Sequence, residues 1–388
     1  MLLIDEPYVS PFLIDTARRH GFPLIATPTA RRLVDDNTLP WVAPEEALRR
    51  IDQRPDYPLY SASENGLAWL VQHLPHHELT RHSQALKDKA RFRALIQDLF
   101  PDFYYRPVSL AEIQGLDPEA LPFPLVVKPS VGFFSIGVHV VHTAADWPRV
   151  KAELQPERLK SIFPPSVLDT EHFLLEALIP GEEYAIDYYH DAEGRVVILN
   201  LLHHVFSSGT DTSDRVYTTS QEIILQHRGR IGALLSEIGS KLNLRNFPAH
   251  AEVRIDAQGR VVPIEVNPLR FGGWCTSGDL LGVSLGLNAY AHFFHQQTPD
   301  WAEVFRGKED KLYSIVVLNN NSGLAEAEIA GFDYDRLAAD FEHPVEIRQL
   351  DIQRYPTFGF VFAETSRGNQ KELREILTSD LQQYVVRK

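Results

Sequence analysis

The stretch HAEVRIDAQGRVVPIEVNPLRFGG, residues 250–273, decides the fold of this protein. Two runs of strand-forming residues flank the turn sequence DAQG at 256–259, and this pattern predicts a β-hairpin. The register of the hairpin stays open, because Gly259 could host a bulge that shifts which residues face each other. Strand centres normally bury apolar residues, so the polar residues inside these two strands call for an explanation.

Three oxygen-bearing side chains gather at one end of the predicted hairpin. Alternate residues of a strand share a face, so Glu252 is expected beside His250. By the same alternation, Glu265 and Asn267 point together and away from Ile264. Two carboxylates and an amide are oxygen ligands that Mg²⁺ accepts while it shares its shell with phosphates. The alternative is a solvated outer face of the sheet with ordinary Glu–Arg pairs.

Three strand-like runs precede the hairpin, at residues 173–178, 184–190 and 195–203, and the turn sequence DAEG at 191–194 predicts that the last two form a hairpin as well. Glu176 and Glu183 lie on either side of the dipeptide Pro180-Gly181. They are either acidic neighbours of a turn or part of a strand whose backbone reads adenine and whose carboxylate binds ribose hydroxyls. The small polar residues of 205–220 predict a flexible loop, and apolar periodicity predicts a helix over 228–242.

A loop with two glycines lies further upstream, between strand-like runs at 124–128 and 138–142. Lys128 ends the first run, and PSVGFFSIG at 129–137 forms the loop. Backbone N–H groups of such a loop can surround a phosphate, and the lysine supplies a point charge. The alternative is a plain hairpin with an exposed lysine. The adjacent Phe133-Phe134 either packs beneath the loop or closes over a ligand.

Residues 81–100, RHSQALKDKARFRALIQDLF, form a basic stretch with helical spacing that ends at Pro101. Lys87 and Lys89 within it are by default charges on a solvated helix face. A loop is expected to follow as far as Leu121.

Both ends of the chain predict mixed α/β structure. In residues 1–88 short apolar strands alternate with helices, which favours a parallel sheet. The C-terminal part contains strand-like runs at 313–317, 345–348 and 358–363 and a final helical run near 369–384.

The composition is that of a globular protein with two to three domains. The 388 residues carry a formal charge of −14, which argues against non-specific nucleic-acid binding. The single cysteine, Cys275, excludes an intrachain disulfide framework and fits a reducing compartment. No uncharged apolar run approaches about 18 residues, and acidic residues stand where a signal peptide is basic. We therefore expect a cytoplasmic protein without a membrane partner.

Taken in order, these motifs resemble those of the ATP-grasp superfamily of carboxylate–amine ligases. The resemblance rests on Lys89 after Asp88, on FPLVVKPSVGFFSIGVHVV, on FLLEALIPGEEYAID and on the hairpin stretch. It implies an α/β (α+β) ATP-grasp fold with a Rossmann-like N-terminal domain, a small β-rich lid subdomain and a larger C-terminal subdomain. The expected parts are an N-terminal domain at 1–88, a helical linker at 89–120, the lid at 121–178 and the C-terminal subdomain at 179–388.

The resemblance also implies roles for residues of this sequence. The implied ATP-binding residues are Lys89, Lys128, Ser135, Glu176, Ala177, Ile179 and Glu183. The implied ligands of Mg²⁺ or Mn²⁺ are Glu252, Glu265 and Asn267. Lys128 and Arg270 are the implied catalytic residues, because they match groups that offset charge on the transferred phosphate. The implied substrate contacts are His250, Arg270, Arg215 and Ser220, although the default for Arg215 is a solvated loop charge.

The implied activity is ATP-dependent activation of a carboxylate as an acyl phosphate, followed by its joining to an amine. An amino-acid-like substrate is the leading expectation, with small molecules as partners and a homodimer as a common arrangement. One alternative is an enzyme similar to biotin carboxylase or to purine-pathway members, which activates bicarbonate or formate. The other is an ATP-binding regulatory protein without catalysis.

Overall fold

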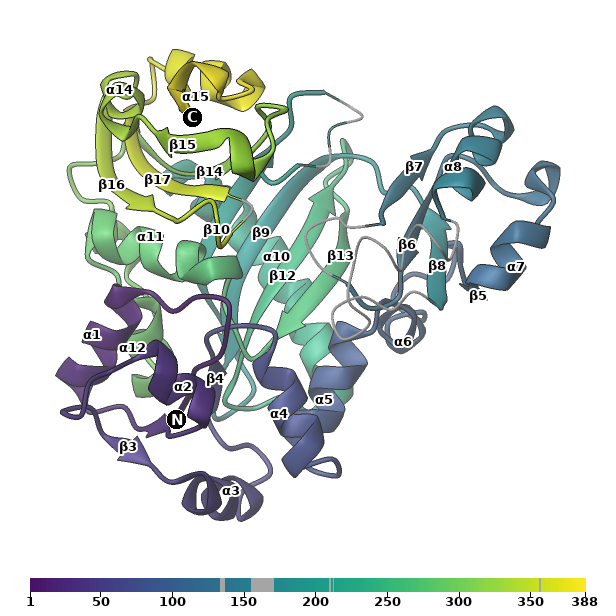
Figure 1. Cartoon of the computed structure of the whole chain (residues 1–388). Coiled ribbons are helices and arrows are strands. Elements are labelled where there is room, and N and C mark those ends of the chain that lie inside the picture. The colour runs from purple at the N-terminus through teal and green to yellow at the C-terminus, as the bar shows by residue number, and fades with distance from the viewer. Residues whose placement is uncertain (133–136, 155–170, 209–210, 212, 356) are drawn as a thin grey trace.

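The computed structural model describes residues 1–388 with the exception of 133–136, 155–170, 209–210, 212 and 356 (Figure 1). In the described part of the chain, helices surround four β-sheets. No helix in these ranges is long and apolar enough to cross a lipid bilayer. The expected mixed α/β architecture is confirmed.

A small parallel sheet opens the chain, as the alternation of strands and helices predicts. Its strands, in the order β3-β2-β1-β4, are β1 (Leu2–Leu3), β2 (Leu24–Ile25), β3 (Trp41–Val42) and β4 (Tyr60–Ser61). The helices of this part are α1 (Pro11–His20), α2 (Pro28–Leu33), α3 (Pro44–Asp52) and α4 (Gly66–His73). The hydroxyls of Ser10 and Thr27 cap α1 and α2 by accepting hydrogen bonds from backbone N–H groups.

The basic stretch expected to be one helix is instead two helices, α5 (Glu78–Lys87) and α6 (Lys89–Leu95). Asp88 interrupts them, because its carboxylate accepts hydrogen bonds from two backbone N–H groups in the first turn of α6. The Ser130 hydroxyl donates to the same carboxylate over 2.8 Å and anchors the break. The interruption places a lysine on each side of Asp88.

An antiparallel sheet, here called the lid sheet, lies to one side of the molecule (Figure 1). Its order is β5-β8-β6-β7, with β5 (Tyr105–Ser109), β6 (Leu125–Pro129), β7 (His139–Val141) and β8 (His172–Ala177). Helices α7 (Leu110–Gly115) and α8 (Trp147–Glu153) share its apolar core. Strand β5 lies where helix and loop were expected. Pro107 weakens the strand signal there, but an edge strand tolerates the missing N–H.

The largest sheet is antiparallel, with the strand order β13-β12-β9-β10-β11-β14-β17-β16. Its strands are β9 (Glu182–His190), β10 (Val196–Val205), β11 (Val216–Thr219), β12 (Phe247–Ile255), β13 (Val261–Pro268), β14 (Lys311–Asn319), β16 (His343–Gln349) and β17 (Thr357–Ser366). The predicted hairpins β9–β10 and β12–β13 are confirmed. Strand β11 corrects the expectation of a loop throughout 205–220, because it completes the sheet between β10 and β14.

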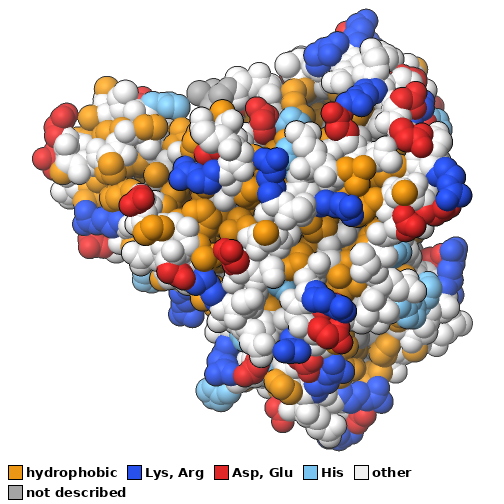
Figure 2. All heavy atoms as spheres, turned by 180° about the vertical axis from the view of Figure 1, so that it is seen from behind, with side chains coloured by type: hydrophobic (Ala, Val, Ile, Leu, Met, Phe, Trp, Pro, Cys, Tyr) orange, Lys and Arg blue, Asp and Glu red, His pale blue; other side chains and the backbone are white. Residues whose placement is uncertain are grey.

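The remaining helices are α10 (Gln221–Leu242), α11 (Thr276–Leu285), α12 (Ala289–His295), α13 (Trp301–Val304), α14 (Tyr334–Ala339) and α15 (Lys371–Thr378). A two-stranded sheet joins β15 (Ile329–Phe332) to β18 (Val385–Arg387). One buried apolar cluster includes Leu3 of the N-terminal part, Leu86 of α5 and Leu269 beyond β13. This shared core fixes α5 against the hairpin. Seen from behind, acidic and basic side chains are interspersed over the surface (Figure 2).

Candidate active site

The hairpin of β12 and β13 pairs Glu252 directly with Glu265. Cβ atoms of directly opposite residues lie about 4.5–5.5 Å apart, so the two carboxylates share a small volume. The bulge leaves Ile264 unpaired and does not lie at Gly259, which occupies the turn with a φ of +79°. Ile264 lines the same cavity as both carboxylates, so the expectation that it points away from Glu265 was wrong.

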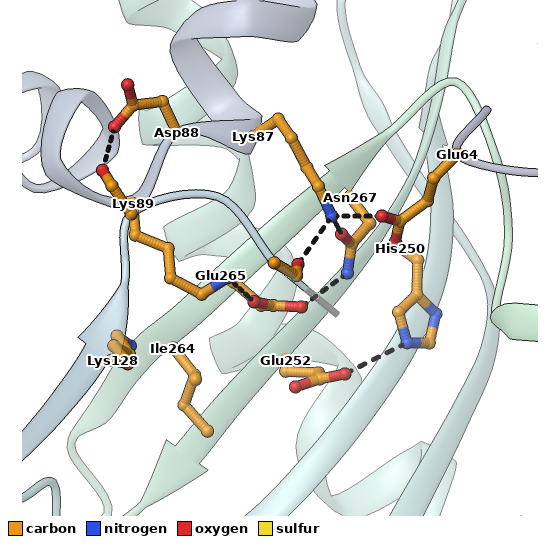
Figure 3. Close-up of polar contacts among 12 residues, drawn as sticks. Glu64, Lys87, Asp88, Lys89, Lys128, His250, Glu252, Ile264, Glu265 and Asn267 are labelled. Carbon is orange, nitrogen blue, oxygen red and sulfur yellow. Dashed lines mark hydrogen bonds and ion pairs between the residues drawn. The ribbon is translucent and has the colours of Figure 1, made fainter. Parts of the chain in front are cut away.

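Lysine side chains contact one side of this carboxylate pair (Figure 3). Lys89 Nζ lies 2.7 Å from Glu265 Oε2, and Asn267 Nδ2 donates to Glu265 Oε1 over 2.8 Å. Lys87 Nζ donates to Asn267 Oδ1, also over 2.8 Å. Burial opposes ionisation of Glu265, but the two lysines outweigh it and hold the pKa of Glu265 below its usual range. Interpreting both lysines as solvated charges was therefore wrong.

Glu252 lies in a different electrostatic environment from its partner. Burial raises the pKa of Glu252 well above its usual range, and repulsion from nearby carboxylates, mainly Glu265, adds to the effect. His250 Nε2 lies 3.8 Å from Glu252 Oε1, and Nδ1 of the same ring lies 2.7 Å from Oδ1 of the buried Asp187. A cation bound beside Glu252 would stabilise its ionised form.

A second group of buried charges joins the lid sheet to the hairpin. Lys128 Nζ on β6 lies 2.6 Å from Glu176 Oε1 on β8, and Arg93 Nε on α6 donates to Glu176 Oε2 over 2.7 Å. Arg93 also donates to the carbonyl of Pro263 on β13 over 2.7 Å. Burial opposes ionisation of Glu176, but the two cations outweigh it and lower its pKa to about 2.

Glu183 on β9 is held in place by two basic side chains. His204 Nδ1 lies 2.8 Å from Glu183 Oε1, and Arg254 Nε donates to Oε2 over 3.0 Å. Arg254 also donates to the carbonyl of Ile179 over 2.8 Å. Burial opposes ionisation of Glu183, but these partners keep its pKa below the usual range. The carboxylate is thus fixed beside the segment that links β8 to β9.

The turn before Glu183 depends on glycine at position 181. Gly181 has a φ of +107°, and a Cβ there would meet the backbone of Ile255 and Asp256. We expect Gly181→Ala to lower the free energy of unfolding by more than about 1 kcal/mol. Gly229→Ala, in the open interior of α10, is the matched control and should raise it by about 0.5–1 kcal/mol. Denaturant unfolding measures both, and equal effects would contradict this account.

Two cavities meet at the carboxylate pair. The first lies between the lid sheet and the hairpin and is lined by Lys89, Lys128, Gly132, Glu176, Leu178, Ile179, Glu183, His204 and Arg254. The second is a larger cleft beside the N-terminal part, lined by Glu64, Lys87, His250, Asn267, Arg270, Trp274 and Tyr355. Both cavities are lined by Asp211, Asp214, Glu252 and Glu265. A molecule in the first cavity can therefore present one end to a molecule in the second.

Most predicted site residues line one of these cavities: Lys89, Lys128, Glu176, Ile179, Glu183, His250, Glu252, Glu265, Asn267 and Arg270. Ala177 ends β8 directly before them. Arg215 and Ser220 are not among the lining residues. Arg215 is buried, contrary to a solvated loop charge, and the Ser220 hydroxyl caps α10. Ser135 and Phe133-Phe134 lie outside the described residues.

Sequence reasoning missed three charged partners in the site. Glu64 Oε2 lies 2.6 Å from Lys87 Nζ, and its other carboxylate oxygen pairs with Arg270. Burial opposes ionisation of Glu64, but these two cations lower its pKa to about 2. In the sequence, Ser61 and Glu64 have the spacing of a helix-capping signal, which gives Glu64 a local role, yet α4 begins only at Gly66. Arg93 and Arg254 were the other two, because their partners Glu176 and Glu183 are 83 and 71 residues away in the chain.

The oxygen donors of the hairpin fit a divalent cation such as Mg²⁺. Glu252 and Glu265 supply carboxylates, and Asn267 supplies an amide oxygen. Mg²⁺ commonly binds one or two protein carboxylates and takes its other ligands from phosphate and water. Among the described residues, no group of three or more His, Cys, Asp or Glu could hold an ion by itself.

Residues 121–278 match the family model of the ATP-grasp domain. This segment is therefore similar to ATP-grasp domains. It includes both the Lys128–Glu176 pair and the β12–β13 hairpin. A curated relative, the carbamoyl phosphate synthase large chain of Clavibacter michiganensis subsp. michiganensis, is 25% identical over 190 residues. The match covers 47% of this chain and 16% of that relative.

Solved structures share the architecture over nearly the whole chain. An L-amino acid ligase from Bacillus licheniformis has a TM-score of 0.64 at 18% identity, covering 100% of this chain and 98% of that one. N5-carboxyaminoimidazole ribonucleotide synthetase from Thermotoga maritima has a TM-score of 0.62 at 13% identity, and the match covers 99% of this chain and 98% of that one. Biotin carboxylase from Campylobacter jejuni has a TM-score of 0.60 at 11% identity, and the match covers 94% of this chain and 87% of that one. These similarities confirm the expected ATP-grasp fold.

Proposed function

We propose that this protein is an ATP-dependent ligase that activates a carboxylate as an acyl phosphate and joins it to an amine. The observation that carries the proposal is the meeting of two cavities at Glu252 and Glu265. Lys89 and Arg270 lie around that meeting point, where a transferred phosphate needs positive charge.

The lining of the first cavity supplies groups suited to binding ATP. Lys89 and Lys128 supply cations for the phosphates, and Glu183 supplies a fixed carboxylate for ribose hydroxyls. The base would lie along the segment of Ile179 that links β8 to β9. Glu252, Glu265 and Asn267 would hold Mg²⁺, which when bound neutralises charge on the phosphates.

The chemistry follows from the poor reactivity of a carboxylate. An oxygen of the carboxylate attacks the γ-phosphorus of ATP, and ADP leaves with the electrons of the broken bond. The amine then attacks the acyl carbon, inorganic phosphate leaves as the new C–N bond forms, and the nitrogen releases one proton. Lys128 and Arg270 offset negative charge on the transferred phosphoryl group and on the acyl oxygen. The larger cleft, which Arg270 and His250 line, would hold both the carboxylate and the amine.

An amino-acid-like substrate is the first candidate, since the L-amino acid ligase has the same fold over the full length of both chains. Activation of bicarbonate is the second candidate, because biotin carboxylase also has this fold. The two predict different responses to added substrate.

Phosphate release from Mg·ATP tests the proposal directly. We expect purified protein to release phosphate when pooled L-amino acids are added, and splitting the pool identifies the substrate. A parallel reaction with bicarbonate serves as the comparison. Stimulation by bicarbonate alone would favour the second candidate. ATP binding without release in any reaction, including a wider panel of acids and amines, would contradict the ligase and favour a regulatory protein.

A further inference from the structure

Two cations in the larger cleft converge on a single carboxylate. Lys87, at the end of α5, and Arg270, just beyond β13, both pair with Glu64. Figure 3 shows Lys87 between Glu64 and Asn267. The side chains of Lys87 and Arg270 are only 11% and 9% exposed. Two largely buried positive charges therefore pair directly with the same carboxylate.

Arg270 has hydrogen-bonding capacity that its neighbours leave unused. Nη1 donates to the carbonyl of Phe271 over 2.7 Å, and Nη2 pairs with Glu64. Nε is buried and has no hydrogen-bond partner among the described residues. A buried donor without an acceptor is unfavourable, and a guanidinium binds carboxylates best with two N–H groups. The cleft thus lacks an acceptor that an anionic ligand would supply.

Lys87 is placed to contact the same ligand. Its Nζ donates to Glu64, to Asn267 and, over 3.4 Å, to the carbonyl of Gly132 in the loop after β6. Asn267 in turn bonds Glu265, at the point where the two cavities meet. A carboxylate beside Lys87 would therefore lie close to the end of a nucleotide in the first cavity.

We propose that Lys87 binds the substrate carboxylate that is to be activated, together with Arg270, and that Glu64 is a positioning residue for both cations. The proposal rests on the proposed ligase function and adds to it the residue pair that selects a carboxylate. A bound carboxylate gives the two cations a second negative partner and gives Nε of Arg270 an acceptor.

Steady-state kinetics of Lys87→Met provide the first test. With the amino acid identified by phosphate release, we expect its KM to rise about 10- to 100-fold, the usual effect of losing one charged hydrogen bond. The KM for ATP should stay unchanged, and Lys87→Arg should recover part of the loss. Arg81→Gln is the matched control, because Arg81 is an exposed cation on the same helix that pairs with Glu78. An unchanged KM for the amino acid in Lys87→Met would overturn the proposal.

A binding measurement without turnover separates this proposal from the ligase function. Acetate labelled with carbon-13 in the carboxyl group is titrated with protein, and the width of its NMR signal reports binding. We expect broadening with the wild type and with Arg81→Gln, and little with Lys87→Met. Equal broadening in all three, or none with the wild type, would overturn the role of Lys87. A failure of phosphate release with every substrate would instead contradict the proposed function.

Discussion

Replacing Glu265 by Gln is expected to lower Mg·ATP-dependent phosphate release by about 10²- to 10³-fold. Glu265 lies directly opposite Glu252 and accepts hydrogen bonds from Lys89 and Asn267. Glutamine keeps the shape of the side chain but removes the charge that a divalent cation and Lys89 require. Initial rates measured over a range of Mg²⁺ concentrations give the size of the effect.

Two controls make this result interpretable. Glu237→Gln introduces the same chemical change on the exposed side of α10 and should leave the rate unchanged. The thermal unfolding curve of Glu265→Gln should resemble that of the wild type, which would show that lost activity is not lost folding. A wild-type rate and an unchanged Mg²⁺ dependence in this variant would refute the metal assignment.

Replacing Arg93 by Met is expected to destabilise the protein by about 3–5 kcal/mol. The side chains of Arg93 and Glu176 are 2% and 3% exposed, so the carboxylate has little access to water. Without Arg93, only Lys128 would neutralise Glu176, and the carbonyl of Pro263 would lose its donor. Urea unfolding measures the loss as a shift in the midpoint at an unchanged slope of unfolding free energy against urea concentration.

Comparison variants distinguish a buried pair from a general effect of removing arginine. Arg91→Met removes an exposed cation from the same helix and should change stability by no more than about 0.5 kcal/mol. Combining Arg93→Met with Glu176→Leu removes both partners and should be less destabilising than Arg93→Met alone. Equal stability of Arg93→Met and wild type would show that the pair contributes nothing.

Local spacing was enough to predict much of the fold. The parallel pairing at the N-terminus and the β9–β10 and β12–β13 hairpins were predicted from alternation and turn residues. Most of the site residues that the ordered motifs predicted also line the two cavities, among them Lys128 and Glu183. These features depend on neighbours within a few residues, which the sequence states directly.

Partners distant in the chain could not be predicted in this way. Glu64 and Arg270 are 206 residues apart, and Lys87 and Asn267 are 180 residues apart. Lys87 looked like a solvated charge because it belongs to a basic stretch with helical spacing. The sequence does not show which distant carboxylate it pairs with. Only the packing of α5 on β13 creates the pair.

The sequence by itself determined the local elements, the order of the motifs and the set of charged side chains available for a site. The tertiary structure alone decided the bulge at Ile264, the strand β11 and the burial of Arg215. The physical reason is that periodicity and turn chemistry act over a few residues. Register, burial and charge pairing instead depend on which distant segments the folded core brings together.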